Sequence, residues 1–528
     1  MRAAGREVLV TAAASQAMDA EAQSEWSLNQ FALVEAAGRR AAGSLLDSFP
    51  RLFREAPSGP STVILAGAGN NGADAMVILR SLIFLGKLEA EKAALLVTKI
   101  PGGEEENPRS LLYRSLLKLG VPAASALDGE QVLRPILEGA ALIIDGLSGT
   151  GLRGALRGEA AALAALANSR RRGSLLVSVD VPSGLSDDWK PGMPLVEAGA
   201  TLALEPEKLC LYKPAARPFC GRVLHTGGIF PEALTEKYRA AELVDWDYSR
   251  TLIPPVPPDS YKYGRGLVEI RAGAPGSSGA AAIAARGAQA AGAGLVRLLV
   301  DPAIQSVLAV GASGIMVAEE QAAGPRFKAD ALLLGPGWGR GPERRRSLEE
   351  ALALEEGGTP LVLDADAIHL AKDRVFHGNA LLTPHPGELA AYTGLPREEI
   401  LSDPARLLPA LAREKRAVFL FKSHVLFIAS PAGDLAVVDG MNPSLAVGGS
   451  GDLLAGLCAG IAARRRAMAA GCRPADLYAC ALAGAGLLIR AAGEMANRFT
   501  DPLELADLAA DLAGRAWLPG SPGGGTYG

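Results

Sequence analysis

The sequence predicts a protein of two α/β domains with parallel sheets. Short apolar runs alternate with helical patterns along the chain, the order that parallel strands and crossover helices produce. At 528 residues the chain also exceeds what one hydrophobic core usually covers. The segment 252–258 reads LIPPVPP, and its prolines cannot continue a helix or a central strand. We therefore predict an N-terminal domain at 1–250, a linker at 251–258, a C-terminal domain at 259–515 and a disordered tail at 516–528.

The predicted elements follow from apolar periodicity. Helix 75–85 has apolar residues at three- and four-residue spacing, and the Ala/Gly-rich helix 279–293 is able to pack closely on a sheet. The predicted strands are 62–66, 141–144 and 175–180 in the first half, and 267–271, 296–300, 331–334, 361–364 and 418–422 in the second.

The composition excludes several classes of protein. Hydrophobic residues make up 49% and charged residues 21%, and the net charge of −4 gives no footprint for nucleic acid or an anionic membrane. The apolar stretch 477–489 is too short to span a bilayer, and the N-terminus lacks the apolar core of a secretory signal. The five cysteines have no CxxC spacing, which argues against a zinc site or a disulfide framework. We expect a cytoplasmic protein with no nucleic-acid or membrane partner.

The most informative segment is 442–456, which joins a glycine turn to an apolar helix. The first amides of a helix have no internal partner, so this turn can bind an anion. The amides belong to Gly448, Gly449, Ser450 and Gly451. Asp452 then lies where it can take a proton from a hydroxyl that is being phosphorylated. The alternative is an ordinary capped helix start with an aspartate favoured by the helix dipole.

In the first half, three polar turns follow predicted strands, at 67–74, 145–152 and 180–185. Ligands of open α/β sheets bind outside the carboxyl ends of the strands, so we expect these turns to form one crevice. Glycine-rich turns of this kind can bring backbone amides to phosphate oxygens.

The side chains of these turns indicate two kinds of chemistry. Asn71, Asp145 and Ser183 offer hard oxygen ligands for a monovalent or a hard divalent cation. Asp180 ends an apolar strand, where partial burial is expected to raise the pKa of its carboxyl and suit it to acid–base work. Loop capping is the alternative role for both aspartates.

The motifs GxGNNGxD, DxxxGTGLRG and DVPSGL, in this order, resemble the NAD(P)H-hydrate epimerase domain over residues 8–230. The resemblance implies a Rossmann-like three-layer αβα domain in which Asn71, Asp145 and Ser183 bind K⁺ and Asp180 contacts the hydrated ring as a catalytic residue. The implied substrate-binding residues are Asn70, Asn71, Gly72, Ala73, Asp74, Gly149, Thr150, Gly151, Leu152, Arg153, Gly154 and Ala155. Ala73 and Ala75 replace two glycines of the family pattern, and a positive φ at Ala73 would cost about 1 kcal/mol.

The second half resembles the ribokinase-like NAD(P)H-hydrate dehydratase over residues 260–512. The motifs that carry this resemblance are 262–266, 276–281, 290–296, GPGWG at 335–339, LDADA at 363–367, TPHPGE at 383–388, Lys422 and 448–456. It implies that Asp452 is the catalytic base, while Lys422 and the 448–451 amides bind the nucleotide. The implied residues for the hydrated substrate are Ala280, Gly337, His385 and Asp452. Mg²⁺ would accompany ADP or ATP, held mainly by phosphates and water.

Together the two resemblances predict a bifunctional repair enzyme that works as a homo-oligomer. One domain interconverts R and S hydrates of NADH or NADPH, and the other dehydrates the S epimer with ADP or ATP. The dehydratase phosphorylates the ring hydroxyl, and phosphate then leaves as the C=C bond reforms. The alternative is a ribokinase-like small-molecule kinase, for example for a vitamin, with a non-catalytic N-terminal binding or dimerisation module.

Overall fold

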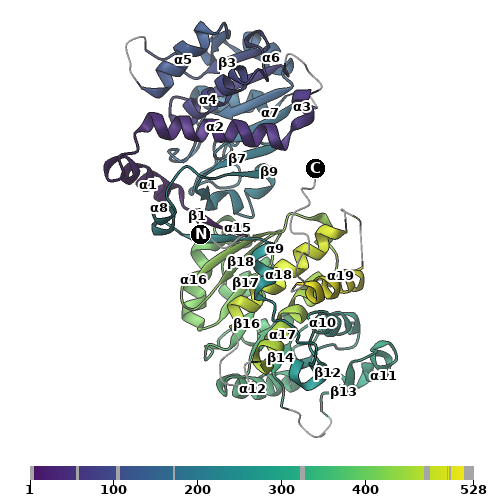
Figure 1. Cartoon of the computed structure of the whole chain (residues 1–528). Helices are drawn as coiled ribbons and strands as arrows, with labels where there is room; N and C mark the ends of the chain where they lie inside the picture. The colour runs from purple at the N-terminus through teal and green to yellow at the C-terminus, as the bar shows by residue number, and fades with distance from the viewer. Residues whose placement is uncertain are drawn as a thin grey trace. The chain divides into compact units, whose positions relative to one another are not determined.

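The computed structural model describes residues 5–54, 59–102, 107–170, 173–321, 328–468, 476–495, 498 and 501–516 (Figure 1). Two compact units divide at Ala241 and Glu242, and Gly5 and Arg6 belong to the C-terminal one. Residues 242–250 therefore lie in the C-terminal unit, ahead of the linker that the prolines predicted. The reason is pairing, because β10 (Ala241–Val244) joins β19 (Leu435–Asp439) in a parallel ladder. Residues 517–528 of the predicted tail lie outside the described residues.

The N-terminal unit contains a parallel sheet with the order β4-β3-β2-β5-β6-β7-β9. Its strands are β2 (Thr62–Ala66), β3 (Ala93–Val97), β4 (Ala123–Ser125), β5 (Leu142–Gly146), β6 (Leu175–Val179), β7 (Ala200–Leu204) and β9 (Arg222–Thr226), and β1 (Arg6–Val10) pairs separately with β8 (Glu207–Lys208). Its helices are α1 (Ala12–Ser24), α2 (Gln30–Ser48), α3 (Pro50–Arg54), α4 (Asn70–Phe84), α5 (Pro108–Lys118), α6 (Glu130–Glu138), α7 (Gly158–Asn168) and α8 (Glu232–Lys237).

Strand β2 shows why this unit has three layers. Ile64 and Ala66 join a buried cluster with residues of α2, α4 and α5, whereas Val63 and Leu65 join another with residues of α6 and α7. A strand that is apolar on both faces needs helices on both sides of the sheet. The three-layer αβα prediction is confirmed.

The C-terminal unit has the strand order β13-β12-β11-β14-β15-β16-β17-β18-β19-β10. Only β17–β18 and β18–β19 are antiparallel among the pairs of this order. Besides β10 and β19, the strands are β11 (Leu267–Arg271), β12 (Leu295–Val300), β13 (Met316–Glu319), β14 (Ala331–Leu334), β15 (Leu361–Leu363), β16 (Ala380–Leu382), β17 (Val418–Phe421) and β18 (Val425–Ala429). The helices are α9 (Trp246–Ser249), α10 (Ser278–Ala290), α11 (Pro302–Gly311), α12 (Pro342–Glu356), α13 (Ala365–Leu370), α14 (Pro386–Thr393), α15 (Arg397–Ser402), α16 (Pro404–Lys415), α17 (Ser450–Met468), α18 (Leu477–Glu494) and α19 (Pro502–Arg515).

Small residues let α10 and α17 approach closely. A Cβ on Gly456 would lie 2.1 Å from the Ala284 carbonyl oxygen, and one on Gly287 would lie 2.6 Å from the Leu453 carbonyl oxygen. The Ala/Gly-rich composition of α10 is therefore a packing requirement. This packing fixes the start of α17, which carries Asp452, against the sheet.

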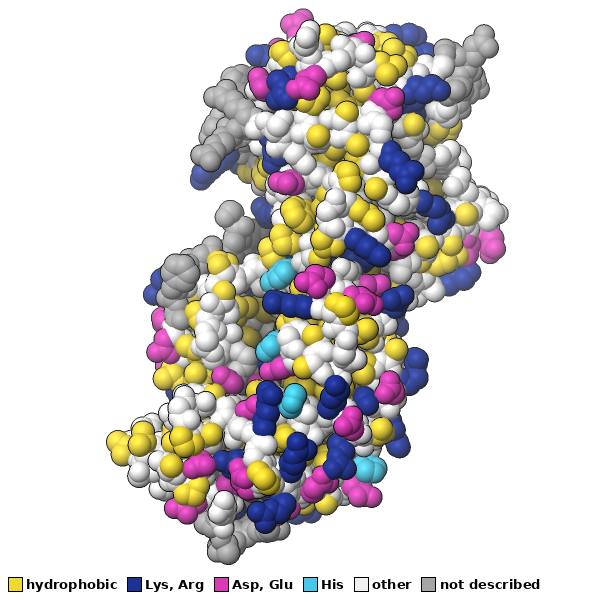
Figure 2. Space-filling view, turned by 180° about the vertical axis from the view of Figure 1, so that it is seen from behind, with side chains coloured by type: hydrophobic (Ala, Val, Ile, Leu, Met, Phe, Trp, Pro, Cys, Tyr) yellow, Lys and Arg dark blue, Asp and Glu magenta, His cyan; other side chains and the backbone are white. Residues whose placement is uncertain are grey.

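Helix α18 is the one helix in the described part of the chain that is long and apolar enough to cross a membrane. Its apolar window is 72% buried inside the protein, where it packs in the core with α17 and α19. Four cysteines are buried free thiols, and the fifth, Cys472, lies outside the described residues. On the face shown in Figure 2, basic and acidic side chains are intermixed over both units.

Candidate active sites

A cavity of about 740 Å³ opens at the carboxyl ends of the strands of the N-terminal unit, and the three predicted turns all contribute to its wall. The predicted substrate-binding residues that line it are Asn70, Asn71, Asp74, Gly149, Thr150, Gly151, Leu152, Arg153, Ala155 and Asp180. Helices α1 and α2 close the same cavity with Gln16, Asp19 and Gln30. Gln16 donates to the Thr150 carbonyl oxygen, and Gln30 donates to Asn70 Oδ1 at 2.8 Å. The turns are therefore fixed by side chains from the N-terminal helices.

Gly72, Ala73 and Gly154 were predicted to bind substrate but are not among the residues that line this cavity. Gly72 lies inside α4, where a Cβ would come within 2.4 Å of the Gly67 carbonyl oxygen. Ala73 is also helical and is 1% exposed, so its methyl needs no positive φ and packs in the core. The departure from the family's glycine at this position leaves the cavity wall intact.

The three predicted K⁺ ligands are connected through Ser148. Asn71 Nδ2 donates to the Ser148 carbonyl at 2.8 Å, and the Ser148 amide donates to Ser183 Oγ at 2.8 Å. Ser183 Oγ in turn donates to Asp145 Oδ1 at 2.6 Å. Asn71 Oδ1 is buried and accepts no hydrogen bond from the described residues. An unpartnered buried amide oxygen is a suitable ligand for a monovalent cation.

Asp180 follows β6 with a left-handed backbone, φ +67°, which is strained for a residue other than glycine. Its Oδ1 lies 2.5 Å from Lys208 Nζ, and Lys208 also donates to the Leu204 carbonyl at 3.1 Å. Both side chains are buried on the cavity wall. Lys208 was not predicted as a site residue, although a lysine among apolar residues was a usable signal in the sequence.

Two further carboxyl groups line the cavity near this ion pair. Burial raises the pKa of Asp19 to about 6. The charge of Lys208 opposes this rise, and the charge of Asp180 adds a smaller rise. Burial also holds the pKa of Asp74 well above its ordinary range, and the charges of Asp180 and Asp19 add to this effect. Asp74 Oδ1 is buried without a hydrogen-bond partner among the described residues. The cavity thus holds groups that can exchange protons near neutral pH.

In the C-terminal unit, α17 begins at Ser450, and Asp452 lies in its first turn. Gly449 has φ +96°, and Ser450 caps the turn through its Oγ on the Val447 carbonyl at 3.1 Å. Within the described residues, the amides of Gly448, Gly449 and Gly451 donate no hydrogen bond. These three amides are free to bind an anion, whereas the fourth predicted amide, that of Ser450, donates to the Val447 carbonyl at 3.4 Å.

Lys422 follows β17 and reaches this helix start. A Cβ on Gly451 would lie 3.2 Å from Lys422 Nζ, which in turn lies 2.5 Å from Asp364 Oδ1. Asp364 also accepts a hydrogen bond from Thr383 Oγ1 at 2.7 Å. Asp364 belongs to the LDADA motif at 363–367, but the motif alone predicted no role for this residue. The structure places it as the fixed partner of the lysine.

The charges around Asp452 set its protonation. Burial raises its pKa to about 6, Asp364 and Glu388 act in the same direction, and Lys422 opposes them. Burial also raises the pKa of Glu388 above its ordinary value, with Lys422 opposing it and Asp364 adding to it. With a pKa of about 6, the Asp452 carboxylate is basic enough to accept a proton and remains mostly ionised at neutral pH.

His385 caps α14 through its ring. Its Nδ1 accepts from the Gly387 amide at 2.9 Å and the Glu388 amide at 3.3 Å, so the neutral ring carries its proton on Nε2. Glu388 accepts from the His385 amide at 2.8 Å and completes the capping box. The ring is exposed and has a structural role besides the predicted contact with substrate.

The structure brings Ala280 and Gly337 together. Gly337 has φ +57°, and a Cβ on it would lie 2.7 Å from Ser277 Cβ and 3.1 Å from Ala280 Cβ. The two predicted pocket residues therefore form one surface of small side chains. In the described part of the chain, no cluster of three or more His, Cys, Asp or Glu could hold a metal ion.

The comparisons with known proteins match both halves of the chain. A family model of NAD(P)H-hydrate dehydratase matches residues 268–512, and one of the YjeF-related protein N-terminus matches residues 30–210. The bifunctional NAD(P)H-hydrate repair enzyme Nnr of Moorella thermoacetica is 32% identical over 480 residues, which are 86% of this chain and 88% of that protein. The enzyme of the same description from Salinibacter ruber is 31% identical over 96% of this chain and 94% of its own length.

Among solved structures, the ADP/ATP-dependent NAD(P)H-hydrate dehydratase of Bacillus subtilis, co-crystallised with ATP and Mg²⁺, has a TM-score of 0.45 and 24% identity to this chain. The match covers 51% of this chain and 97% of that one.

Proposed function

The chain belongs to the family of bifunctional NAD(P)H-hydrate repair enzymes, and from this premise we propose how its two units divide the reaction. The N-terminal unit interconverts the R and S hydrates of NADH or NADPH in the cavity that Asp180 lines. The C-terminal unit phosphorylates the hydroxyl of the S hydrate at Asp452 and eliminates phosphate. Each unit supplies its own acid–base groups, so the two activities are separable by single substitutions.

The observation that carries the dehydratase assignment is the group at the start of α17. Asp452, the unpaired amides of Gly448, Gly449 and Gly451, and the ammonium of Lys422 meet there. Asp452 takes the hydroxyl proton while the hydroxyl oxygen attacks the terminal phosphorus of the nucleotide. The bond from that phosphorus to the bridging oxygen breaks, and the amides and Lys422 stabilise the charge on the transferring group.

The second step needs a leaving group and the loss of a ring proton. The bond from the ring carbon to the phosphorylated oxygen breaks, and the oxygen leaves with the bonding electrons as phosphate. The neighbouring ring carbon gives up a proton to water as its C–H electrons form the C=C bond. Hydroxide leaves poorly and phosphate leaves well, which is why the nucleotide is consumed. ADP or ATP with Mg²⁺ is the proposed donor, with the metal held by phosphate oxygens and water.

In the N-terminal unit, the buried pair of Asp180 and Lys208 supports the epimerase assignment. The 2.5 Å ion pair holds the Asp180 side chain at the cavity wall, where the hydrated ring would lie. Asp19 is a further group for proton exchange with the ring hydroxyl. K⁺ would be held by Asn71, Asp145 and Ser183, beside the nucleotide phosphates. We place the enzyme in the cytoplasm, where its substrates form.

Purified S hydrate tests the dehydratase half. With ADP or ATP and Mg²⁺, the full chain should form NADH and one equivalent of inorganic phosphate, and Asp452→Asn should abolish both. The kinase alternative predicts instead a stable phosphorylated product without a rise in absorbance at 340 nm. The variant Asp373→Asn, at an exposed carboxylate outside the α17 group, serves as the matched control and should retain phosphoryl transfer.

A further inference from the structure

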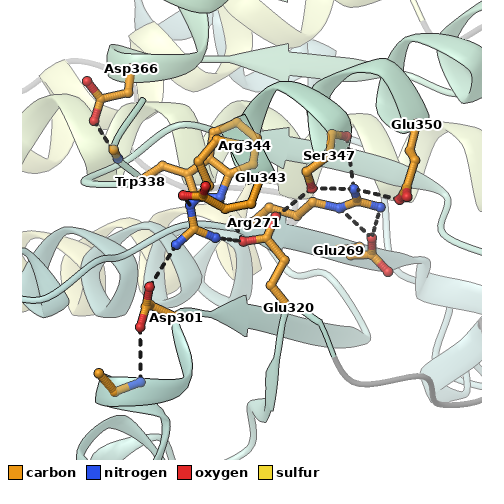
Figure 3. A network of polar contacts seen from close by, with 12 residues as sticks. Glu269, Arg271, Asp301, Glu320, Trp338, Glu343, Arg344, Ser347, Glu350 and Asp366 are labelled. Carbon is orange, nitrogen blue, oxygen red and sulfur yellow. Dashed lines mark hydrogen bonds and ion pairs between the residues drawn. The ribbon is translucent and has the colours of Figure 1, made fainter. Parts of the chain in front are cut away.

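A network of charged and polar side chains contacts Trp338 of the GPGWG turn, residues 335–339 (Figure 3). The mechanism proposed above does not use this network. At its centre is the carboxylate of Glu320, just after β13. It accepts hydrogen bonds from Trp338 Nε1 at 3.0 Å, from Ser347 Oγ at 2.5 Å and from Arg344. A carboxylate with three donors from separate positions has one preferred geometry.

Arg344 connects this carboxylate to a second one. It lies in α12, is 4% exposed, and its guanidinium is also 3.1 Å from Asp301 Oδ2. Asp301 follows β12 and caps α11 through the Ala303 amide. The guanidinium lies 5.7 Å from the centre of the Trp338 ring. A buried guanidinium needs such partners, because an unpaired buried charge is strongly unfavourable.

The network continues into the sheet. Ser347 Oγ accepts a hydrogen bond from Arg271 at 2.7 Å, and Arg271 pairs with Glu269 at 3.1 Å. Both residues belong to the central strand β11. The Trp338 ring is therefore tied to the sheet through side chains as well as through its own backbone.

The same turn carries the small-residue surface described above. Trp338 is fully buried, and Gly337 before it is held with φ +57° against Ala280. On the other side, the Gly339 amide donates to Asp366 Oδ2 at 2.8 Å. The turn is thus fixed on both sides of Gly337. A shift at Trp338 must move Gly337 relative to Ala280.

We propose that Glu320 and Arg344 are positioning residues of the dehydratase: they hold Trp338 and so fix Gly337 against Ala280, where the hydrated ring binds. The inference rests on the proposed function, which places the ring at these two residues. Glu320 and Arg344 are distant in the sequence from the nucleotide-binding turn at 448–451. Among the described residues, they form no ion pair or charged hydrogen bond with that turn. It should therefore affect substrate affinity and leave the nucleotide site unchanged.

The test compares Glu320→Gln, Arg344→Met and Arg344→Lys with wild type on pure S hydrate. Arg344→Met should raise KM for the hydrate about tenfold or more with kcat changed less than threefold, because the surface of Gly337 and Ala280 binds the ring equally in the ground state and the transition state. Glu320→Gln should act in the same direction. Arg344→Lys, which keeps the charge, should recover part of the loss. Arg345→Met, an exposed neighbour on α12, should behave as wild type.

Two further measurements separate positioning from loss of folding. The dissociation constant for ATP and the thermal melt should show that the C-terminal unit is folded in each variant. Trp338→Phe, which removes the indole N–H together with part of the buried ring system, should raise KM, and combining it with Glu320→Gln should add little to the rise. Unchanged KM in all variants, or equal loss of ATP binding and hydrate binding, would overturn the inference. If wild type itself does not dehydrate the S hydrate, the proposed function fails and the inference fails with it.

Discussion

The pH dependence of dehydration follows directly from the surroundings of Asp452. As a base it must be ionised, and its pKa of about 6 means that protonation removes activity as the pH falls. At pH 5 about one eleventh of the carboxyl is ionised, so kcat should be about tenfold below its plateau at pH 8. The acid limb should fall tenfold per pH unit below pH 6.

Two substitutions should move this limb in opposite directions. Glu388 raises the pKa of Asp452, so Glu388→Gln should extend activity to lower pH. Lys422 lowers that pKa, and its ammonium would lie 3.2 Å from a Cβ on Gly451, the residue before Asp452. Lys422→Met removes this opposing charge and should move the limb to higher pH.

The assay is kcat for S hydrate at saturating nucleotide from pH 5 to 9, followed at 340 nm or by chromatography of NADH, with the loss of NADH alone measured at each pH. Asp452→Asn supplies the control without the titrating base. If both substitutions move the limb the same way, Asp452 is not the titrating base.

Three other predictions concern stability and the separation of the activities. Asp452→Asn should stabilise the C-terminal unit at pH 8 by about 1–3 kcal/mol, because a carboxyl pKa that is raised in the folded state lowers stability above that pKa. Thermal melts should show that this gain vanishes below pH 4, and an equal gain at pH 4 would contradict the prediction. Lys208→Met leaves Asp180 unpaired and should stop the turnover of R hydrate while S hydrate is still consumed in the coupled assay. The control Lys190→Met, at an exposed lysine, should change the turnover of neither hydrate. Gly456→Ala puts a methyl 2.1 Å from a carbonyl of α10 and should destabilise by about 2 kcal/mol or more, while Gly493→Ala, with open space, should stabilise slightly in denaturant titrations.

Much of the sheet could be predicted from the sequence because its strands are buried on both faces. Strands β2, β11 and β14 have the predicted bounds, since each is a continuous apolar run between polar turns. The hairpin of β18 and β19 was not predicted, because its pairing depends on neighbours in the sheet that periodicity does not report. Helix α4 begins at Asn70, five residues before the predicted start at Ala75, because the polar first turn of a helix has the composition of a loop.

The site residues divide in the same way. Glycine turns and strand-end aspartates could be found from local pattern, and the structure brings those of each unit together. The two ion pairs, Asp180 with Lys208 and Asp364 with Lys422, could not be predicted from local pattern. Lys422 and Asp364, for example, are 58 residues apart, and only the register of the strands brings them together. The burial that raises the pKa of Asp19 is likewise a property of the folded cavity.

The measurement that tests the central claim most directly is the recovery of NADH from a mixture of R and S hydrates with the full chain, ADP or ATP, and Mg²⁺, followed at 340 nm. Two active units predict complete recovery, faster than the spontaneous epimerisation measured with Lys208→Met. Recovery that stops at the S fraction would contradict the assignment of the N-terminal unit. No recovery with either nucleotide would contradict the account as a whole.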